Sequence, residues 1–385
     1  MRAKRKVCAF AVTAALALSV PFLATGCSGG GSEGSGGDQA PSTEQTEQAT
    51  EQTVTDDAGR ENTIPAGDNL TSIYCTSPIS ELYLFTLAPE KAAGANSDYT
   101  DSQLQYLPDN VADLPSYGTM ANGGTLNTEA IMAAGVQVIL NVAQADITQL
   151  DIDNADALQE QTGIPVLLFN GSVEKTPDTY RSIGAVLGQA DRAEEMASYL
   201  ENVYTEVSEA VASIPEEERT TVYYAEGPDG LKTEPASSNH FTTFLEAGAK
   251  NVADIDNSNG GATGGGMTQV SLENVIAWNP EVIIAWDDTE RGGADDLIRT
   301  SSDWESIDAV ANDRVYTIPC VPFMWGDRPP SVTRYIGMQW LANKLYPDVY
   351  DVDMIEETKN FYSLFFSVDL TDDEAKSILF LDEEA

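Results

Sequence analysis

One long stretch of alternating apolar and polar positions runs from residue 191 to residue 214. Its apolar residues recur at steps of four and three and are Met196, Leu200, Val203, Val207, Val211 and Ile214. This period places them on one face of a helix. Asp191 and Glu194 make a capping-box-like start, and Pro215 ends the pattern. The stretch therefore predicts one helix, roughly 35 Å long at 1.5 Å per residue.

Patterns of strands alternating with helices lie on both sides of this helix. The strands read as short, continuous apolar runs, at 72–75, 136–142 and 164–169 before the helix and at 221–225, 282–286 and 314–318 after it. Continuous apolar strands separated by helices are typical of parallel sheets buried on both faces. An ordinary surface helix remains an alternative, but we favour a rigid strut that joins two α/β lobes.

Smaller elements complete both predicted lobes. Asp57-Ala58-Gly59-Arg60 predicts the turn of a hairpin over 54–64, Ser77-Pro78 begins a helix that ends at Leu87, and 114–125 predicts a loop. Glu129–Leu140 aligns without a gap with Glu273–Ile284. Each is a short helix, a Gly or Asn-Pro break and a buried strand. Together with the long helix, the match supports two equivalent lobes, and convergence of two helix–turn–strand units is the alternative.

The N-terminus predicts export. Basic residues at 2–6 precede an apolar run at 7–23, which is short for a membrane span and contains Pro21. Leu-Ala-Thr-Gly-Cys at 23–27 resembles a bacterial lipobox, so we expect a lipoprotein signal peptide over 1–26 and lipidation of Cys27. Residues 27–52 are nearly devoid of apolar side chains and predict a disordered tether. The remaining boundaries are 53–188 for lobe one, 189–215 for the helix and 216–385 for lobe two.

Net charge and cysteine content bear on two questions, which are binding to nucleic acid and the presence of disulfides. The chain has 62 acidic and 20 basic residues, a net charge of −42, which disfavours binding to nucleic acid. Of its four cysteines only Cys75 and Cys320 lie beyond Cys27, too few for a disulfide framework. Two separate buried thiols are the simplest expectation, with a bridge or a shared metal site as the alternative.

Several stretches, taken together, resemble one family. They are Leu126–Ile131, Leu158–Val166, Leu187–Met196, Ala247–Ala253 and Ser271–Ile284, and their order and spacing resemble the substrate-binding proteins of ABC importers for ferric siderophores, haem and cobalamin. The resemblance runs from about Val54 to Leu379. It implies two Rossmann-like α/β lobes joined by a single long rigid helix, a ligand cleft between the lobes, and small closing motions.

The resemblance also implies docking onto a permease through one exposed carboxylate on each lobe. Glu81 falls at the first position of this kind. The second falls near Thr242, which is not acidic, so Glu246, one helical turn further on, is the substitute. An exposed helix carboxylate that is merely solvated is the alternative at both positions.

Loops after the predicted strands supply the candidate ligand contacts, because ligands of such folds bind outside the carboxyl ends of strands. The candidates are Ser77, Tyr117, Asn239, His240, Trp286, Trp325 and Arg328. Phe323 and Trp325 predict a flat surface for stacking on a planar or macrocyclic ligand, with Arg328 facing its anionic groups. The alternative is a packed loop in which Arg328 pairs with Asp327.

His240 is the only histidine. At the start of a helix its ring could ligate iron or cobalt, with Tyr117 opposite, or it could be a hydrogen-bonded surface residue. Because sites for bare metal ions generally need several such ligands, a single histidine favours a chelated metal.

The sequence disfavours an enzyme. It has no phosphate-binding loop, no pair of histidines spaced for a metal and no nucleophile elbow, and the glycine-rich run 260–266 lacks a preceding strand. We therefore expect a monomeric, extracytoplasmic, membrane-anchored binding protein that needs no cofactor and delivers an iron or cobalt complex to an ABC permease and its ATPase. A lipoprotein that binds a ligand or surface polymer without transport is the alternative.

Overall fold

The computed structural model describes residues 50–253, 255, 267–286 and 293–381, all of which belong to one compact unit. Cys27, the signal sequence and the glycine-rich run 260–266 lie outside the described residues. Within the described ranges no helix is long and apolar enough to cross a membrane. Strand β1 (Glu51–Thr55) begins two residues before the predicted end of the tether, so that boundary moves toward the N-terminus.

Lobe one is built on a parallel sheet of order β3-β4-β5. These strands are Ile73–Cys75, Val138–Val142 and Val166–Phe169. The predicted hairpin is confirmed, because β1 pairs antiparallel with β2 (Glu61–Pro65). The helices of this lobe are α1 (Pro78–Leu87), α2 (Asp101–Leu104), α3 (Thr128–Ala133) and α4 (Gln149–Thr162), with 3-10 turns at Gly67–Asn69, Pro89–Lys91, Asp109–Asp113, Ala121–Gly123 and Val173–Lys175.

Lobe two has the same architecture, with a parallel sheet of order β11-β10-β6-β8. Its strands are β6 (Thr221–Ala225), β8 (Lys250–Asn251), β10 (Val282–Trp286) and β11 (Val315–Ile318), and a short antiparallel pair joins β7 (Lys232–Thr233) to β9 (Thr268–Gln269). Its helices are α7 (Thr242–Glu246), α8 (Leu272–Trp278), α9 (Asp295–Thr300) and α10 (Asp308–Ala311), with 3-10 turns at Glu216–Glu218 and Asn239–Phe241.

The matched sequences adopt matched structures. Glu129–Leu140 forms α3 and enters β4, whereas Glu273–Ile284 forms α8 and enters β10. The chain reverses between helix and strand at Gly135 and Asn279, which have φ angles of 72° and 45°. Glycine, and to a lesser degree asparagine, adopts this left-handed conformation at low cost, which explains the two breaks in the pattern.

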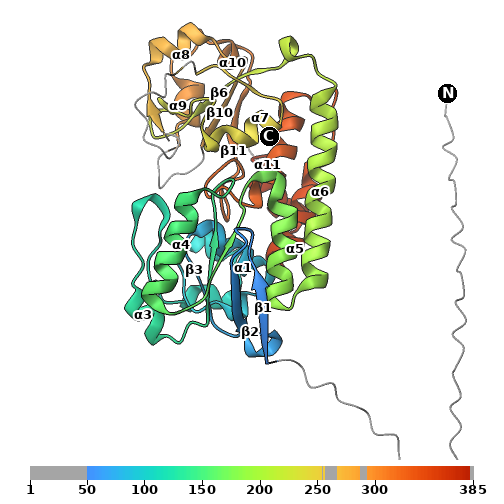
Figure 1. Cartoon of the computed structure of the whole chain (residues 1–385). Helices are drawn as coiled ribbons and strands as arrows, with labels where there is room; N and C mark the ends of the chain where they lie inside the picture. Colours follow the sequence, from blue (N-terminus) through green and yellow to red (C-terminus); the bar gives the residue numbers. More distant parts are fainter. Residues whose placement is uncertain (1–49, 254, 256–266, 287–292, 382–385) are drawn as a thin grey trace, which may run out of the picture. The chain divides into compact units, whose positions relative to one another are not determined.

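Helix α6 (Ala190–Ala212) is the predicted strut and extends along both lobes (Figure 1). All six predicted apolar positions are buried, against α5 (Thr176–Leu187) on one side and α11 (Thr333–Leu345) on the other. The predicted capping box is wrong: the residue before the helix is Gln189, which makes no side-chain cap, and Glu194 instead pairs with Arg181 at 2.8 Å. Packing of its apolar face against α5 and α11 therefore holds the helix in position.

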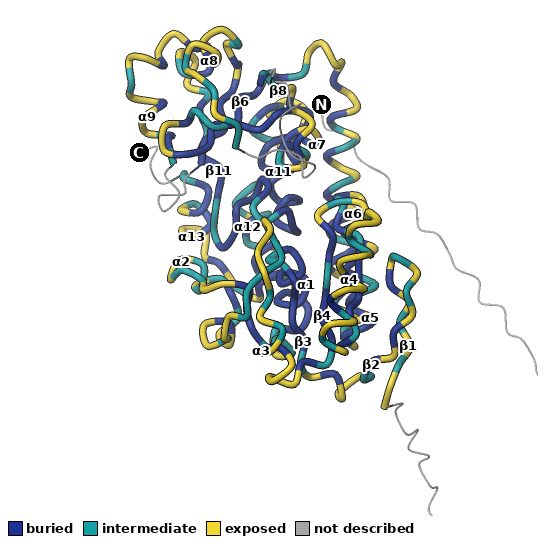
Figure 2. The backbone as a smooth tube through the Cα atoms, turned by 60° about the vertical axis from the view of Figure 1, so that its left-hand side comes forward, coloured by how far each residue is buried: buried dark blue, intermediate teal, exposed yellow. Residues whose placement is uncertain are grey.

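Figure 2 shows which parts of the chain are buried. Side chains alternate between the two faces along each strand, and the buried hydrophobic residues fall into three clusters. One face of the lobe-one sheet, with Tyr74 and Ile139, packs under α3 and α4, and one face of the lobe-two sheet, with Tyr223 and Ile283, packs under α8 to α10. The opposite faces of both sheets join a single large cluster that includes α6. The two lobes therefore share a continuous core beside the strut.

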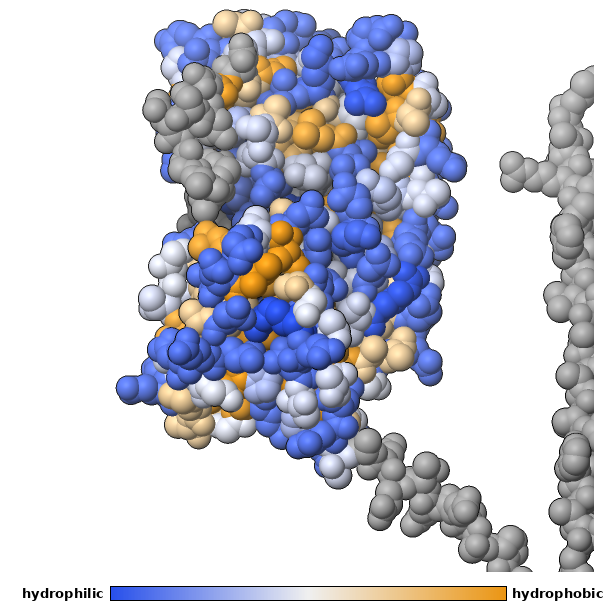
Figure 3. Space-filling model, in the orientation of Figure 1, coloured by the Kyte–Doolittle hydropathy of each residue, from blue (hydrophilic) through white to orange (hydrophobic). Residues whose placement is uncertain are grey.

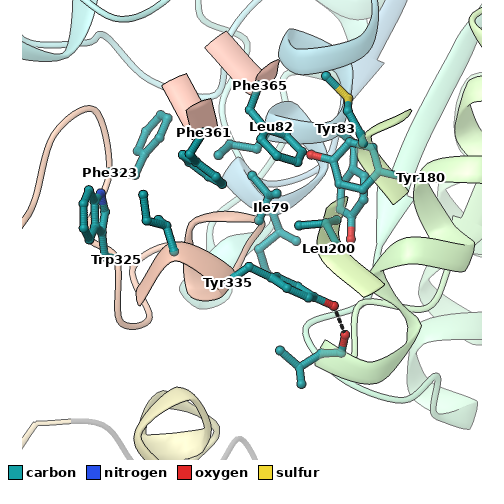
Figure 4. Packing of buried hydrophobic residues seen from close by; sticks show 14 of the residues in the cluster. Ile79, Leu82, Tyr83, Tyr180, Leu200, Phe323, Trp325, Tyr335, Phe361 and Phe365 are labelled. Atoms are coloured by element: carbon teal, nitrogen blue, oxygen red, sulfur yellow. Dashed lines mark hydrogen bonds between the residues drawn. The ribbon is translucent and has the colours of Figure 1, made fainter. Parts of the chain in front are cut away.

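The C-terminal segment reaches back to lobe one, although the sequence placed it in lobe two. It forms α12 (Met354–Phe361), a π-helical turn at Tyr362–Phe366 and α13 (Asp372–Ile378). The rings of Phe365 and Tyr180 lie 5.8 Å apart, and Arg192 Nη2 donates to the Leu364 carbonyl at 3.2 Å. Figure 4 shows Phe361 and Phe365 in the same apolar layer as Leu82 and Leu200. This segment thus ties α1 to the strut.

The outer surface agrees with the composition. Hydrophilic residues cover most of the face shown in Figure 3, with smaller apolar patches between them. No disulfide joins the two cysteines of the folded unit: Cys75 is buried in β3 and Cys320 is half-buried after β11. The expectation of two separate buried thiols is therefore met in part, since Cys320 is only half-buried. Burial raises the pKa of the Cys75 thiol well above its ordinary value.

Candidate functional site

Five ionisable side chains gather at the carboxyl ends of the lobe-two strands. They form the lobe-two charge cluster and are Glu226, Glu234, His240, Asp327 and Arg328. Glu226 directly follows β6, and the loop after β11 supplies Asp327 and Arg328. Because parallel strands bring their carboxyl ends to one edge, residues distant in sequence meet there.

Arg328 is the centre of the cluster. Its Nη2 atom donates to Glu226 Oε1 at 2.8 Å and to Glu234 Oε1 at 2.7 Å, and its Nε atom lies 3.4 Å from Asp327 Oδ2. The guanidinium also stacks over the Trp286 ring, 5.4 Å from its centroid. The Arg328 side chain is 18% exposed, whereas the three carboxylates have no exposure. The predicted alternative, an Arg328–Asp327 pair, is therefore present, within a larger network.

His240 borders the network on its accessible side. Its Nδ1 atom lies 2.8 Å from Asp327 Oδ2, and Arg328 Nη1 lies 3.4 and 3.5 Å from the two ring nitrogens. The other Asp327 oxygen accepts a 2.8 Å hydrogen bond from Tyr224, whose hydroxyl accepts one from Trp286 Nε1 at 2.6 Å. These contacts orient the ring, and the His240 side chain keeps 17% of its surface exposed.

The cluster carries more carboxylates than cations. Glu226 Oε2 and Glu234 Oε2 are buried without a hydrogen-bond partner. Burial raises the pKa of Glu226 well above its ordinary range; Arg328 opposes this effect, while Asp327 and Glu234 add to it. Burial would lower the pKa of Arg328, but Asp327 and Glu226 outweigh it and the net shift is upward. Arg328 thus stays charged, and burial favours the protonated form of Glu226.

Arg334 stands close to this cluster but differs from Arg328. It lies in the first turn of α11, is 3% exposed and donates from Nη2 to the Asn239 carbonyl at 2.9 Å. No carboxylate of the described residues forms an ion pair with it, and its Nε atom has no hydrogen-bond partner. Burial lowers the pKa of Arg334 to about 10, against the opposing effect of Asp327.

Contacts between the lobes show that their strand ends face each other. Tyr335 of α11 donates from its hydroxyl to the carbonyl of Val173, which follows β5, at 2.6 Å. Gln103 Nε2 of α2 donates to the Pro322 carbonyl, which follows β11, at 3.1 Å. The lobe-two charge cluster therefore lies at the edge that faces lobe one.

The lobe-one candidates have local roles. Ser77 caps α1, where its Oγ accepts from Ser80 N at 3.4 Å and lies 3.1 Å from Ser80 Oγ. The Tyr117 ring tilts against Tyr74, with centroids 5.5 Å apart. Within the described ranges, no contact joins Tyr117 to His240, so the structure does not bring together the opposed pair that the sequence suggested.

The predicted stacking surface is wrong. Trp325 has no exposure, Trp286 is 1% exposed and Phe323 is 5% exposed. The close approach of α11 explains the burial of Trp325, because a Cβ atom on Gly337 would lie 2.0 Å from the Trp325 carbonyl oxygen. Trp286 lies under the Arg328 guanidinium, and none of the three buried rings presents a face to a macrocycle.

The predicted docking role of Glu81 is also wrong. Glu81 is 1% exposed, and it accepts hydrogen bonds from Asn96 N at 2.5 Å and from the Tyr99 hydroxyl at 2.7 Å. The loop carrying these two residues covers α1, and Tyr99 contacts Phe323 of lobe two with ring centroids 6.0 Å apart. Burial raises the pKa of Glu81 to about 7. Glu246 is half-buried and accepts from Tyr204 at 3.1 Å, so it remains available only in part.

Hollows on the described surface do not coincide with the cluster. One of about 240 Å³ lies among Trp340, Met354 and Leu379, and one of about 140 Å³ lies among Pro177, Tyr204 and Tyr335. The described residues contain no group of three or more His, Cys, Asp and Glu side chains that could hold a metal ion. The cluster thus suits a ligand that presents hydrogen-bonding atoms better than a bare metal ion.

Sequence reasoning found His240 and Arg328 but missed Glu226, Glu234 and Arg334. The position of Glu226, directly after a predicted strand, was a usable signal. Glu234 lies in a turn-rich stretch and Arg334 within a predicted helix, and neither has a local pattern that marks it.

Comparisons with known proteins agree with this architecture. A profile of the periplasmic binding protein family matches residues 98–321, more than half of the chain. The structure of an ABC transporter solute binding protein from Sulfurospirillum deleyianum is 32% identical with a TM-score of 0.76, covering 85% of this chain and 99% of that one. A periplasmic solute binding protein from Veillonella parvula shares the fold, at 21% identity and a TM-score of 0.67, over 86% of this chain and 98% of that one.

The molybdate-binding protein MolA of Haemophilus influenzae is similar in part of its sequence. It is 35% identical over 130 residues, which are 34% of this chain and 34% of MolA, so the match spans about a third of that relative. The molybdate-bound MolA structure shares the fold, with 20% identity and a TM-score of 0.64 over 83% of this chain and 99% of that one. The chain therefore belongs to the periplasmic binding protein family and has the two-lobed fold of ABC transporter solute-binding proteins, which are not enzymes.

Proposed function

We propose that this protein is the extracytoplasmic solute-binding component of an ABC importer and that it captures a metal-containing solute between its lobes. The observation that carries this proposal is the position of His240 and Arg328. Both lie on the edge of lobe two that faces lobe one, and both are held by buried carboxylates. Such anchoring keeps the donors in place before a ligand arrives, which lowers the entropic cost of binding.

A compact solute fits the site better than a macrocycle. Trp325 and Trp286 are buried and cannot stack on a haem or corrin ring. His240 Nε2 and Arg328 Nη1 are polar donors suited to oxygen atoms around a metal. The partial similarity to a molybdate-binding protein supports a metal oxyanion, and the resemblance to siderophore-binding proteins supports a ferric chelate. Both ligand types surround a metal with oxygen atoms.

A thermal-shift panel on the unit from Gln48 onward tests this proposal. The solutes are molybdate, tungstate, ferric siderophores of hydroxamate and catecholate type, haemin and cyanocobalamin. A ligand at 100 times its dissociation constant adds about 2.7 kcal/mol to the free energy of unfolding. We expect stabilisation by an oxyanion or by a ferric chelate. If only haemin or cyanocobalamin stabilises the protein, the compact-solute proposal is wrong.

The variant His240→Asn tests the place of binding. Asparagine keeps a donor for Asp327 but lacks the second ring nitrogen, so we expect affinity for the stabilising solute to fall at least tenfold, about 1.4 kcal/mol. Glu216→Gln, at an exposed position in the turn after α6, is the control and should bind as the parent does. Equal affinity in His240→Asn and the parent would place the ligand elsewhere.

Transport and anchoring need their own measurements. We propose that Cys27 carries the lipid anchor and that Glu246 contributes to docking on the permease. Cys27→Ser should release the protein from membranes in a fractionation experiment. Permease in nanodiscs with its ATPase should accelerate ligand release from the parent protein, and less so from Glu246→Gln. A binding protein that the permease leaves unaffected would instead be a ligand-sensing lipoprotein.

A further inference from the structure

Arg334 is buried, and no carboxylate of the described residues forms an ion pair with it, although the chain is rich in carboxylates. The sequence has 62 acidic residues for 20 basic ones. Arg60, also mostly buried, pairs with Asp56 and Asp156, and Arg328 reaches three carboxylates. Arg334 has only the Asn239 carbonyl among the described residues. A buried charge without a counter-charge is costly, so its retention favours a partner other than the described residues.

The position of Arg334 in its helix adds to this cost. It is in the first turn of α11, a helix of 13 residues with no acidic residue in that turn. The first turn of a helix carries partial positive charge, which repels a cation and attracts an anion. Both the helix end and the guanidinium therefore favour negative charge at the same place.

The nearest carboxylate is already engaged. Asp327 influences Arg334 through charge, but its Oδ1 atom accepts from Tyr224 at 2.8 Å and its Oδ2 atom lies 2.8 Å from His240 Nδ1. Asp327 also approaches Arg328 Nε at 3.4 Å. Oδ2 has no hydrogen-bond partner in spite of these short distances. No ion pair joins Asp327 to Arg334 among the described residues, so Asp327 acts on Arg334 through charge without direct contact.

Arg334 also lies where the two lobes meet. The Asn239 carbonyl that accepts its hydrogen bond is adjacent to His240 in the 3-10 turn 239–241 of lobe two. From lobe one, Tyr83 of α1 is close enough to Arg334 for each group to influence the pKa of the other. Figure 4 shows Tyr83 and Tyr335, the residue after Arg334, in the same apolar cluster. A solute bound beside His240 would therefore come within reach of Arg334.

We propose that Arg334 selects the solute by charge, donating to an anionic oxygen of the bound ligand. This inference rests on the proposed function, because it assumes that the solute enters between the lobes, and it adds the charge class of that solute. The class is a metal in an anionic, oxygen-rich form. A metal oxyanion and the negatively charged oxygens of a ferric chelate share this chemistry, and the guanidinium binds oxygens of either kind in a planar, two-donor geometry.

The test compares Arg334→Met and Arg334→Lys with the parent protein. Titration calorimetry and thermal shifts are recorded with molybdate, tungstate, sulfate, an anionic ferric catecholate complex and neutral cyanocobalamin. We expect the parent to bind at least one of the anions. Arg334→Met should bind that anion at least tenfold more weakly, and Arg334→Lys should restore part of the affinity. The Tm of ligand-free Arg334→Met should equal or exceed that of the parent, because an uncompensated buried charge has been removed.

The outcomes separate this inference from the proposed function. If only cyanocobalamin binds the parent, a solute-binding role stands and the charge selection by Arg334 is wrong. If Arg334→Met keeps anion affinity within twofold of the parent, or its ligand-free Tm falls by more than about 5 °C with affinity intact, Arg334 is structural and the inference is overturned. If no solute binds the parent while its melting is cooperative, the proposed function and this inference both fail.

Discussion

Arg328 and Arg334 lie six positions apart and are both largely buried, yet their surroundings differ completely. Three buried carboxylates, an aromatic ring and His240 surround Arg328. A single carbonyl oxygen accepts from Arg334. The carboxylates act to raise the pKa of Arg328, whereas burial lowers the pKa of Arg334.

We interpret Arg328 as a structural charge that stabilises the fold and Arg334 as a charge that binds a ligand. A buried ion needs compensation within the protein, or it costs several kcal/mol of stability. Arg328 has that compensation and holds the loop after β11 in place. Arg334 lacks that compensation, so its charge can contribute to the free energy of binding when an anion binds next to it. Variants that remove a buried charge should therefore act in opposite directions at the two positions.

The largest expected effect is that of Arg328→Met. Removal of the guanidinium leaves Glu226, Glu234 and Asp327 buried with only His240 nearby, so the free energy of unfolding should fall by about 3 kcal/mol, the lower end for a broken buried pair because Arg328 is 18% exposed. Urea unfolding at pH 7 measures this change. Arg334→Met is the matched control and should show no loss. Equal destabilisation by both variants would end the distinction between the two arginines.

An intermediate effect is expected at Glu81, a buried carboxyl whose hydrogen-bond donors, Asn96 N and Tyr99, are neutral. Its pKa rises from 4.5 to about 7 through burial, so the folded state keeps a proton that the unfolded chain loses in this window. Its contribution to stability is complete below pH 4.5 and is lost as the pH rises to about 7. Relative to the parent, Glu81→Gln should therefore gain about 1 to 3 kcal/mol between pH 4.5 and 8.

Denaturant unfolding at a series of pH values measures this gain. The exposed Glu216→Gln is again the control, because its stability relative to the parent should stay constant across the same range. A difference between Glu81→Gln and the parent that does not change with pH would show that Glu81 keeps its charge despite burial.

The smallest effect is expected at Arg181, which pairs on the surface with Glu194 and Glu201. Solvent already stabilises these exposed groups, so Arg181→Ala should lower Tm by no more than about 2 °C, and by less at 0.5 M salt. Calorimetric melting at two salt concentrations tests this. A large loss of Tm that does not depend on salt would mean that the surface ion pairs hold α5 against α6. The difference in burial between Arg181 and Arg328 would then no longer explain their different effects on stability.

Sequence patterns predicted many of the helices and strands because these depend mainly on residues that are close together in the sequence. Thr221–Ala225 and Val282–Trp286 have the predicted bounds, and all six apolar positions of the strut are buried. Helix α5 was not predicted, and the capping box of α6 was wrong because Arg181 pairs with Glu194 from the neighbouring helix. A capping box inferred from two residues of one helix takes no account of an ion pair with a neighbouring helix.

The site was predicted only in part for the same reason. Strand ends indicated the correct edge and therefore His240 and Arg328. Burial was not predictable at Trp325, where α11 closes over the ring, or at Glu81, where the loop 96–114 covers α1. An aromatic residue or a carboxylate in a loop has the same local pattern whether or not a distant segment covers it.

The sequence by itself determined the period of each helix and strand, the succession of strands and helices on both sides of one long helix, and hence the two-lobed fold, because these depend on residues a few positions apart. Only the tertiary structure decided which charges are compensated. Glu226, Glu234 and Arg328 are separated by up to 102 positions yet form one ion network, while Arg334 has no such partner among the described residues. The free energy of a buried charge depends on the atoms within a few ångströms of it, and only folding brings those atoms together.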